Sequence, residues 1–281
     1  MHKILGREQL SPNVTRLEVQ APQIARVRKP GQFVIVHLRD EAERIPLTIA
    51  DANPEAGSIT LVIQSVGKST RDLAALSRGR TIQDIAGPLG HPTELIRSGH
   101  ALCVGGGVGT AVVHPIAKGL RQAGARVTSI IGGRSKEWVI FEHELRLQGD
   151  VLVCTDDGSY GRKGFVTEAL EQALVAGGVD IVYAVGPVPM MRAVASLTRP
   201  YGVRTIVSLN PVMIDGTGMC GGCRVSVGNE MRFACVDGPE FDGHKVNFEE
   251  LMDRLTTYHE SEQESLHTSD AGCCLDRQPP P

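Results

Sequence analysis

The first third of the chain alternates apolar and polar residues in short segments. Residues 14–19 and 58–64 both show this alternation, and residues 32–38 form a third, more apolar segment. A period of two residues is typical of strands that bury one face. No helical period interrupts these segments before Thr70. We therefore expect residues 1–95 to form a closed antiparallel β-barrel.

The middle third contains short, continuous apolar runs instead. Four of them cover residues 100–104, 126–131, 151–155 and 180–185. Each run ends at glycine or acidic residues, and residues with a helical pattern follow. Buried strands that alternate with helices are typical of a parallel α/β sheet. We expect this domain to span residues 96–209.

Two segments of the predicted barrel carry candidate flavin contacts. Residues 44–48 (Arg-Ile-Pro-Leu-Thr) are expected in a loop, where the arginine can pair with a diphosphate and the threonine can donate to a flavin ring. Residues 67–70 (Gly-Lys-Ser-Thr) precede a helical segment at 71–76, and a helix N-terminus favours anions. The plainer alternatives are an exposed arginine beside a strand-start proline, and an N-cap at Ser69 or Thr70. The second segment is not a P-loop, because Val62 stands where that motif needs glycine.

Together the two segments favour a dinucleotide such as FAD, with strand residues 61–64 adding contacts to the flavin. The candidate FAD-binding residues are Arg44, Pro46, Leu47, Thr48, Val62, Gln64, Gly67, Lys68, Ser69 and Thr70.

A glycine-rich turn follows the first apolar run of the middle third. Strand, glycine turn and helix make the phosphate-binding unit of parallel α/β sheets, although the G-x-G-x-G spacing here departs from G-x-G-x-x-G. Ligands of such sheets bind beyond the carboxyl ends of the strands. The candidate nicotinamide-nucleotide residues are therefore Gly105, Gly107, Val108, Gly109, Thr110, Arg134, Asp157, Gly158, Gly186 and Pro187. Arg134 could meet a 2′-phosphate or only a ribose, so both NAD(H) and NADP(H) remain open.

The cysteines indicate a metal centre near the C-terminus. Three of the seven form the pattern Asp215-x4-Cys220-x2-Cys223…Cys235. This matches the plant-type [2Fe–2S] spacing, with a carboxylate at the first cysteine position, and the glycines between the ligands let backbone amides approach the sulfides. The alternatives are a Cys3Asp zinc site or three unrelated thiols, and Asp215 could be only a turn residue before Gly216.

Composition limits the class of protein. The chain has 281 residues, 41% hydrophobic, with a formal net charge of −3, which argues against nucleic acid or a membrane surface as its main partner. No signal peptide or long apolar run is visible. Cys103 and Cys154 lie in apolar runs and are expected to be inert core thiols. These features suit a reducing cytoplasm.

The order of these motifs resembles the ferredoxin–NADP reductase superfamily. Within it the chain is similar to the dihydroorotate dehydrogenase electron-transfer subunit family, over about residues 1–255. The stretches 208–223 and 233–243 resemble most the small subunits of NADH-dependent reduced ferredoxin:NADP oxidoreductases, also called sulfide dehydrogenase subunits beta. Asp215 distinguishes these two resemblances, because the dihydroorotate-type relatives have cysteine at that position and the ferredoxin:NADP type is similar to this chain in having aspartate.

The resemblance implies FAD in the barrel, NAD(H) in the α/β domain and a [2Fe–2S] cluster on Asp215, Cys220, Cys223 and Cys235. It implies a small iron–sulfur segment at 210–248. It also implies a larger partner subunit that resembles the small subunit of glutamate synthase, with its own flavin and [4Fe–4S] clusters, and ferredoxin as a partner of that complex. Residues 249–281 should form a helix and a polar tail, in which Cys273 and Cys274 lack a cluster spacing.

We therefore expect a flavin and iron–sulfur oxidoreductase subunit that exchanges hydride with a nicotinamide and passes on single electrons, with electron bifurcation possible. The chemistry would belong to the cofactors, and no side chain is assigned as a catalytic acid or base. One alternative is an electron-transfer subunit that serves dihydroorotate or sulfide oxidation. Another is a nucleotide-binding regulatory module with a structural metal. The sequence leaves the direction of electron flow and the terminal acceptor open.

Overall fold

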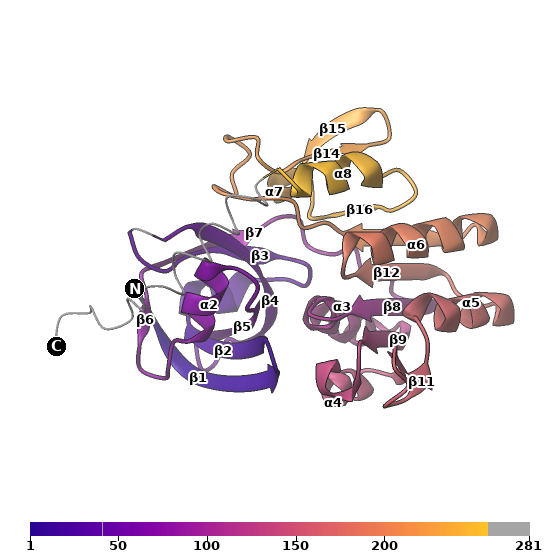
Figure 1. Cartoon of the computed structure of the whole chain (residues 1–281), viewed down its shortest axis with the longest axis horizontal. Helices are drawn as coiled ribbons and strands as arrows, with labels where there is room; N and C mark the ends of the chain where they lie inside the picture. The colour runs from indigo at the N-terminus through magenta and orange to yellow at the C-terminus, as the bar shows by residue number, and fades with distance from the viewer. Residues whose placement is uncertain (41, 258–281) are drawn as a thin grey trace.

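The computed structural model describes residues 1–40 and 42–257. It has three parts: a β-barrel, an α/β unit beside it, and a small C-terminal unit that lies against both (Figure 1). Within the described residues, no helix is long and apolar enough to cross a membrane.

The barrel is one antiparallel sheet with the strand order β6-β1-β2-β5-β4-β3-β7. Its edge strands β6 and β7 are separated only by Gln83, so the two edges of the sheet approach each other and the barrel is nearly closed. Leu17, Ile49 and Leu61 are completely buried inside it. The strands are β1 (His2–Ser11), β2 (Val14–Gln20), β3 (Phe33–His37), β4 (Arg44–Asn53), β5 (Ser58–Gln64), β6 (Thr81–Ile82) and β7 (Asp84–Leu89).

Two expectations for this region are wrong in detail. A helix does precede Thr70: α1 (Pro22–Val27) begins at a proline and is too short to show a helical period. Residues 44–48 are not a loop but the first half of β4, where they pair with β3 alone. Pro46 is tolerated because β4 has no second neighbour until Ile49, so its missing N–H removes no ladder bond.

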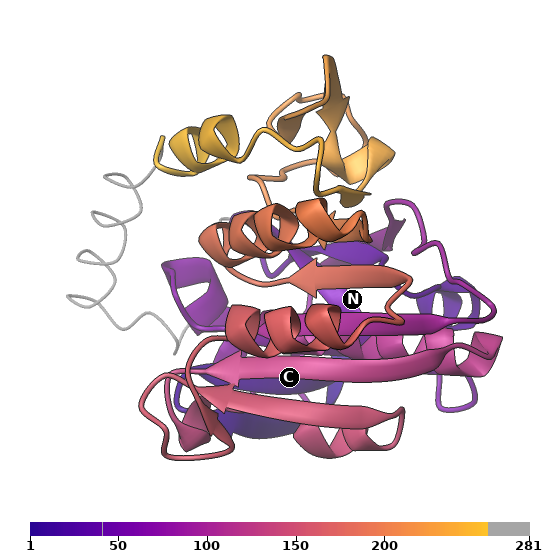
Figure 2. The same cartoon turned by 90° about the vertical axis from the view of Figure 1, so that its right-hand side faces the viewer.

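The α/β unit is a mixed sheet with the order β11-β10-β9-β8-β12-β13-β16. Six strands are parallel, and in Figure 2 several of their arrows point the same way; β16 joins the edge in the antiparallel sense. The strands are β8 (His100–Gly106), β9 (Arg126–Gly133), β10 (Asp150–Thr155), β11 (Arg162–Lys163), β12 (Ile181–Val185), β13 (Arg204–Ser208) and β16 (Glu240–Asp242).

Helices cover both faces of this sheet. Helices α3 (Gly109–Ala123) and α4 (Glu142–Arg146) lie on the face toward the barrel, whereas α5 (Val166–Ala176) and α6 (Val188–Thr198) cover the other face (Figure 1). Alternate residues of β8 separate accordingly, with Cys103 packing toward α3 and Leu102 toward α5 and α6. Cys103 and Cys154 are both buried core thiols, as expected.

The C-terminal unit is a hairpin of β14 (Arg224–Val227) and β15 (Glu230–Phe233) followed by the single turn α7 (Ala234–Asp237) and by α8 (Phe248–Leu255). Phe248 and Leu251 anchor α8 on the same hydrophobic core as α6. The polar tail with Cys273 and Cys274 lies outside the described residues.

Candidate functional site

A cavity of about 420 Å³ separates the barrel from the α/β unit. Strands of the barrel form one wall, and the glycine-rich turn together with the carboxyl ends of β12 and β13 forms the other. Candidate FAD and nicotinamide residues therefore meet in one space. Of these candidates, the lining includes Pro46, Leu47, Thr48, Val62, Gln64, Thr70, Gly107, Val108, Gly109, Gly186 and Pro187.

The barrel wall is built by neighbouring strands. Thr48 pairs across the ladder with Phe33 of β3, which also lines the cavity. Val62 and Gln64 lie on β5 with their neighbours Leu61 and Ile63 turned into the barrel core. The wall is thus a rigid, half-apolar sheet surface that exposes one hydroxyl and one amide, which suits a flat ring that needs few polar contacts.

The segment after β5 forms α2 (Lys68–Ala74), which starts three residues earlier than expected. Its N-cap is Gly67, and Thr70 bonds the Gly67 backbone, accepting from its N–H at 3.0 Å and donating to its carbonyl at 2.9 Å. Ser69 donates to Glu43 at 3.0 Å, and Lys68 pairs with Asp72 at 3.5 Å. Thr70 lines the cavity, whereas Gly67, Lys68 and Ser69 do not. Arg44 is exposed at the start of β4 and is also outside the lining.

The glycine turn brings backbone close to the cavity without side chains. Gly107 has φ of +55°, and a Cβ placed on it would meet nothing within 4 Å, so the backbone there borders open space. Its N–H donates to Gly132 O at 2.9 Å. Gly109 begins the 15-residue α3 and rests on the end of β12, where a Cβ would lie 2.6 Å from the Val185 carbonyl carbon. Gly105 and Thr110 are buried behind the turn.

The remaining nicotinamide candidates lie farther along the sheet edge. Arg134 follows β9, and Asp157 and Gly158 follow β10; all three are exposed and none lines the cavity. The Asp157 N–H donates to Arg134 O at 3.2 Å, which joins the two loops. They are one and two strands away from the glycine turn, on the side where the far half of a bound dinucleotide would extend.

Sequence reasoning missed the back of the cavity. This wall comes from Ser208, the last residue of β13, from Leu209 and Asn210 after it, and from Met213 and Pro239. The signal was available in part, because β13 is a parallel strand whose carboxyl end falls at the same edge as β8 and β12. The contributions of Ala50, Phe33 and Pro239 depend on tertiary packing and had no local signal.

The cysteine pattern forms a compact loop. The Sγ atoms of Cys223 and Cys235 lie 3.2 Å apart, because Cys223 ends the loop just before β14 and Cys235 lies on α7 after the hairpin returns. The Gly218 N–H donates to the Cys235 sulfur. Burial and the neighbouring Cys223 raise the pKa of the Cys235 thiol to about 12.

The other two predicted ligands stand at the exposed side of this loop. Asp215 accepts the backbone N–H groups of Thr217 at 2.9 Å and Cys220 at 2.8 Å, and these bonds lower its pKa. Cys220 is exposed. No three His, Cys, Asp or Glu side chains in the described part of the chain are arranged to hold a metal ion. The facing thiols and the amide aimed at Cys235 nevertheless fit a sulfur-rich cluster better than an isolated carboxylate turn.

The loop is packed on the barrel next to the cavity. Gly216 is buried, and a Cβ on it would lie 2.6 Å from Leu89 Cδ1 and 3.0 Å from Ile35 Cγ1. Met213, two residues before Asp215, lines the cavity. A redox group held in the loop and another held in the cavity would therefore be close neighbours.

A larger cavity, about 970 Å³, lies between the β14–β15 hairpin and the β13–β16 edge. Its charged side chains are largely paired with one another, as in the two bonds from Arg204 to Glu94 at 3.1 and 2.6 Å. Burial raises the pKa of Glu240 to about 7, and Thr93 donates to that carboxyl at 2.6 Å. None of the sequence candidates lines this cavity, whereas the smaller cavity is lined by candidates for both nucleotides.

Similarity to known proteins agrees with this geometry. Residues 210–247 match the model of the iron–sulfur cluster binding domain of dihydroorotate dehydrogenase B. A Thermotoga maritima protein, named as a homolog of the electron transfer subunit of dihydroorotate dehydrogenase B (NAD(+)), is 45% identical over 94% of this chain and 93% of its own length. The electron transfer subunit of Shouchella clausii is 34% identical over 85% of this chain and 94% of its own length.

The chain belongs to the dihydroorotate dehydrogenase B electron-transfer subunit family. A solved structure of an NADH-dependent reduced ferredoxin-NADP oxidoreductase, described for flavin-based electron bifurcation, contains a chain that is 43% identical. It superimposes with a TM-score of 0.91 over 95% of this chain and 97% of that one.

This family confirms the resemblance seen in the sequence, the barrel plus α/β fold and the electron-transfer role in a flavin oxidoreductase. FAD, a [2Fe–2S] cluster and NAD(H) are the redox groups of such a chain. As an electron-transfer subunit, it works in a heteromeric complex with a larger partner. The residues that hold each group are not decided by the similarity and remain predictions.

Proposed function

We propose that this chain takes hydride from a nicotinamide onto FAD in the 420 Å³ cavity and passes single electrons to a cluster in the cysteine loop. The observation that carries this proposal is the cavity itself. Residues predicted for the two nucleotides, from segments more than 30 positions apart in the sequence, line its opposite walls. FAD supplies the conversion between two-electron hydride transfer and one-electron transfer to the cluster.

On the barrel side, Thr48 and Gln64 would orient the flavin ring by hydrogen bonds, while Val62 and Pro46 exclude water from its face. The diphosphate would extend toward Arg44 and the start of α2. The Glu43 carboxylate near Ser69 would repel a diphosphate, so Arg44 is the stronger candidate for that charge.

On the α/β side, the turn before α3 would receive the nicotinamide nucleotide's phosphates. Backbone N–H groups and the N-terminal end of a 15-residue helix favour negative charge there. Gly186 and Pro187 would border the nicotinamide ring. Arg134, Asp157 and Gly158 would contact the adenosine half of either NAD(H) or NADP(H).

For the cluster, we propose Asp215, Cys220, Cys223 and Cys235 as ligands. Cys223 and Cys235 are already close, and Asp215 is bonded to the backbone of Cys220. To bind iron, Asp215 would use the carboxylate oxygens that here accept from the Thr217 and Cys220 amides. Carboxylate oxygen is a harder donor than thiolate, so it should alter the cluster potential.

We further propose that the larger partner resembles the small subunit of glutamate synthase, carries flavin and [4Fe–4S] clusters, and exchanges electrons with ferredoxin. Two observations favour ferredoxin:NADP oxidoreduction over dihydroorotate oxidation. One is the similarity to a chain of the NADH-dependent reduced ferredoxin-NADP oxidoreductase. The other is Asp215, which by the resemblance described for the sequence stands where dihydroorotate-type relatives have cysteine.

The test is to purify the tagged chain anaerobically from its own cells and to identify the subunit that accompanies it. We expect a flavin and [4Fe–4S] protein, and a complex that reduces NADP⁺ with NADH and reduced ferredoxin. A complex that oxidises dihydroorotate with NAD⁺ and ignores ferredoxin would support the alternative subunit assignment and contradict ours.

A further inference from the structure

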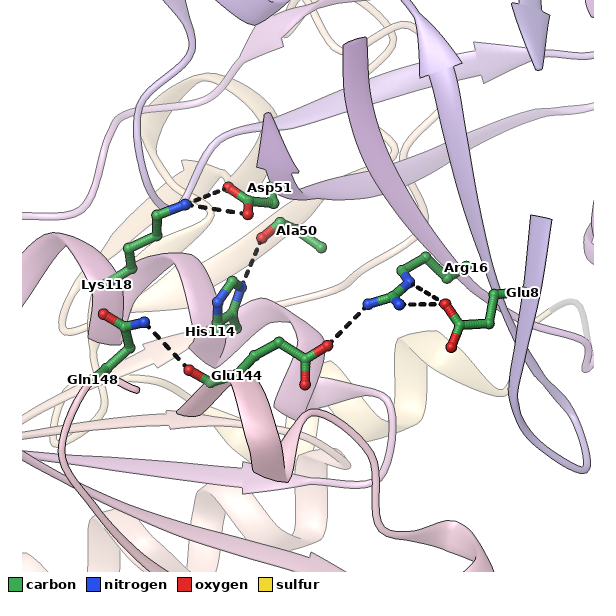
Figure 3. A network of polar contacts seen from close by, with 8 residues as sticks. All are labelled: Glu8, Arg16, Ala50, Asp51, His114, Lys118, Glu144 and Gln148. Atoms are coloured by element: carbon green, nitrogen blue, oxygen red, sulfur yellow. Dashed lines mark hydrogen bonds and ion pairs between the residues drawn. The ribbon is translucent and has the colours of Figure 1, made fainter. Parts of the chain in front are cut away.

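Two side chains of α3 hold the barrel strand that carries the flavin residues. His114 donates from Nδ1 to the Ala50 carbonyl oxygen at 3.1 Å. One helical turn later, Lys118 donates from Nζ to both carboxylate oxygens of Asp51, at 2.9 and 3.1 Å. Residues four apart share a helix face, and here that face meets two consecutive residues of β4 (Figure 3). We call these contacts the α3–β4 clamp.

Asp51 ties the clamp to the rest of the barrel. It also accepts from Arg28 at 2.9 Å and from the Ala52 N–H at 2.9 Å. The Arg28 side chain is only 11% exposed. Burial opposes ionisation of Asp51, but the bonds from Lys118 and Ala52 outweigh it and lower the pKa of the carboxyl. Asp51 is therefore a fixed anion bound from both domains.

A second set of contacts supports His114 from the other side. Arg16 of β2 bridges Glu8 and Glu144, the latter at 2.9 Å on α4 (Figure 3). The Phe141 ring lies between the domains, with its centroid 5.9 Å from the Arg16 guanidinium carbon and 5.3 Å from the His114 ring. His114 is 4% exposed, so its ring cannot turn away without displacing these groups.

The clamp connects directly to the cavity at both of its ends. Ala50, whose carbonyl His114 binds, lines the cavity two residues after Thr48. The first turn of α3 also lines it, through Gly109, Ala111 and Val112. Because a helix is stiff and rises about 1.5 Å per residue, His114 lies only about 7–8 Å along the axis from Gly109. Fixing His114 against β4 therefore fixes the glycine turn relative to the flavin wall.

We infer that His114 and Lys118 are positioning residues that set the distance between the nicotinamide and flavin sites across the domain interface. This inference rests on the hydride transfer proposed above. Hydride transfer is sensitive to distance, and a shift of about 1 Å can cost roughly 100-fold in rate. The clamp prevents that shift in a protein whose two sites lie on separate domains.

His114 acts as a neutral donor. A carbonyl accepts its bond, so Nδ1 carries the proton, and burial lowers the pKa of the ring. The charged groups that face it are Asp51 on β4, Lys118 on α3 and Glu144 on α4. Burial is the largest influence on the ring's pKa. It outweighs the Ala50 bond and the two carboxylates, which raise the pKa, whereas Lys118 lowers it further.

The experiment compares paired variants of the holoprotein by stopped-flow reduction of the flavin with NADH. His114→Phe keeps a ring but removes the donor, whereas His114→Gln retains an amide donor. Lys118→Met removes the charge, whereas Lys118→Arg retains it. Arg126→Met is the matched control, because Arg126 and Asp150 form an exposed ion pair at 3.5 Å within the α/β unit alone.

We expect His114→Phe and Lys118→Met to lower the limiting rate of flavin reduction by roughly 10- to 100-fold with FAD content unchanged. His114→Gln, Lys118→Arg and Arg126→Met should stay near the wild-type rate. Hydrogen exchange should become faster at the backbone amides of residues 44–53 and 109–120 only in His114→Phe and Lys118→Met, the two variants that remove a donor. Equal rates and equal exchange in all five variants would overturn the inference. So would rate losses as large in His114→Gln and Lys118→Arg, which keep a donor, as in His114→Phe and Lys118→Met, which remove it.

The exchange measurement also separates this inference from the function on which it rests. If NADH fails to reduce the flavin of the wild-type protein, the proposed function fails. The exchange rates of the same variants would still show whether the clamp holds α3 to β4. If the hydrogen-exchange rates of His114→Phe and Lys118→Met equal those of the wild-type protein, these contacts do not hold α3 to β4, whatever the activity of the variants.

Discussion

Gly109 offers the sharpest test of how the glycine turn works. In Gly109→Ala, the new Cβ would lie 2.6 Å from the Val185 carbonyl carbon and 2.8 Å from Gly186 Cα, with the Val185 oxygen closer still. All three atoms belong to backbone, so no flexible side chain can yield. Ordinary contact begins near 3.4 Å, and α3 must therefore move away from β12 by about 1 Å.

Two quantities follow from that shift. Overpacking against backbone costs about 1–3 kcal/mol, which lowers Tm by roughly 2–12 °C in a chain of this size. A displacement of about 1 Å between the nicotinamide and flavin sites should slow flavin reduction by roughly 100-fold. A 100-fold loss of rate corresponds to about 2.7 kcal/mol of activation free energy, which is similar in size to the expected loss of stability.

Gly202→Ala is the control at a glycine remote from the cavity. Gly202 precedes β13 and does not line the cavity; it has φ of +64°, and a Cβ on it would meet nothing within 4 Å. Its cost is conformational, about 1 kcal/mol, with no displacement of α3. Stopped-flow flavin reduction and thermal unfolding of both variants provide the assay. If Gly109→Ala reduces its flavin as fast as Gly202→Ala, the close packing of α3 on β12 does not set the nicotinamide position.

Three further outcomes are expected. Asp215→Cys should retain its cluster but change the midpoint potential in an EPR-monitored titration, and an unchanged potential would mean that Asp215 is not a ligand. Burial lowers the pKa of His114, so the unfolded chain takes up its proton first, and stability should fall as pH drops below about 6.5, by at most about 1.4 kcal/mol per pH unit. Urea unfolding at a series of pH values below about 6.5 should show that the free energy of unfolding depends less steeply on pH in His114→Gln than in the wild-type protein. Burial also lowers the pKa of His100, but His100 contributes equally to both proteins. Thr48→Val should shift the flavin midpoint potential and Thr48→Ser should restore it, whereas equal potentials in all three proteins would remove Thr48 from the flavin site.

Local patterns predicted much of this molecule. The alternation at 14–19 and 58–64 identified β2 and β5, and the continuous runs identified β8, β9, β10 and β12. These patterns are reliable because burial on one or both faces of a sheet dictates them. The cysteine spacing likewise pointed to the iron–sulfur segment that the family match covers.

What the sequence could not predict depends on partners distant along the chain. Pro46 made 44–48 look like a loop, because only the pairing shows that β4 lacks a second neighbour there. The three residues of β16 are too few to show a period, and β16 is a strand because β13 offers it an edge. The sequence offers no local signal for the role of His114, because that role depends on the Ala50 carbonyl that the fold places beside it.

The central claim is that one chain carries electrons from NADH through FAD to a [2Fe–2S] cluster. The most direct test is the visible spectrum of the anaerobically purified protein before and after addition of NADH. We predict flavin bands and a broad iron–sulfur absorbance, both bleached by NADH. Flavin that bleaches without any cluster absorbance would contradict the ligand set of Asp215, Cys220, Cys223 and Cys235, and a colourless protein that contains zinc would contradict the redox function altogether.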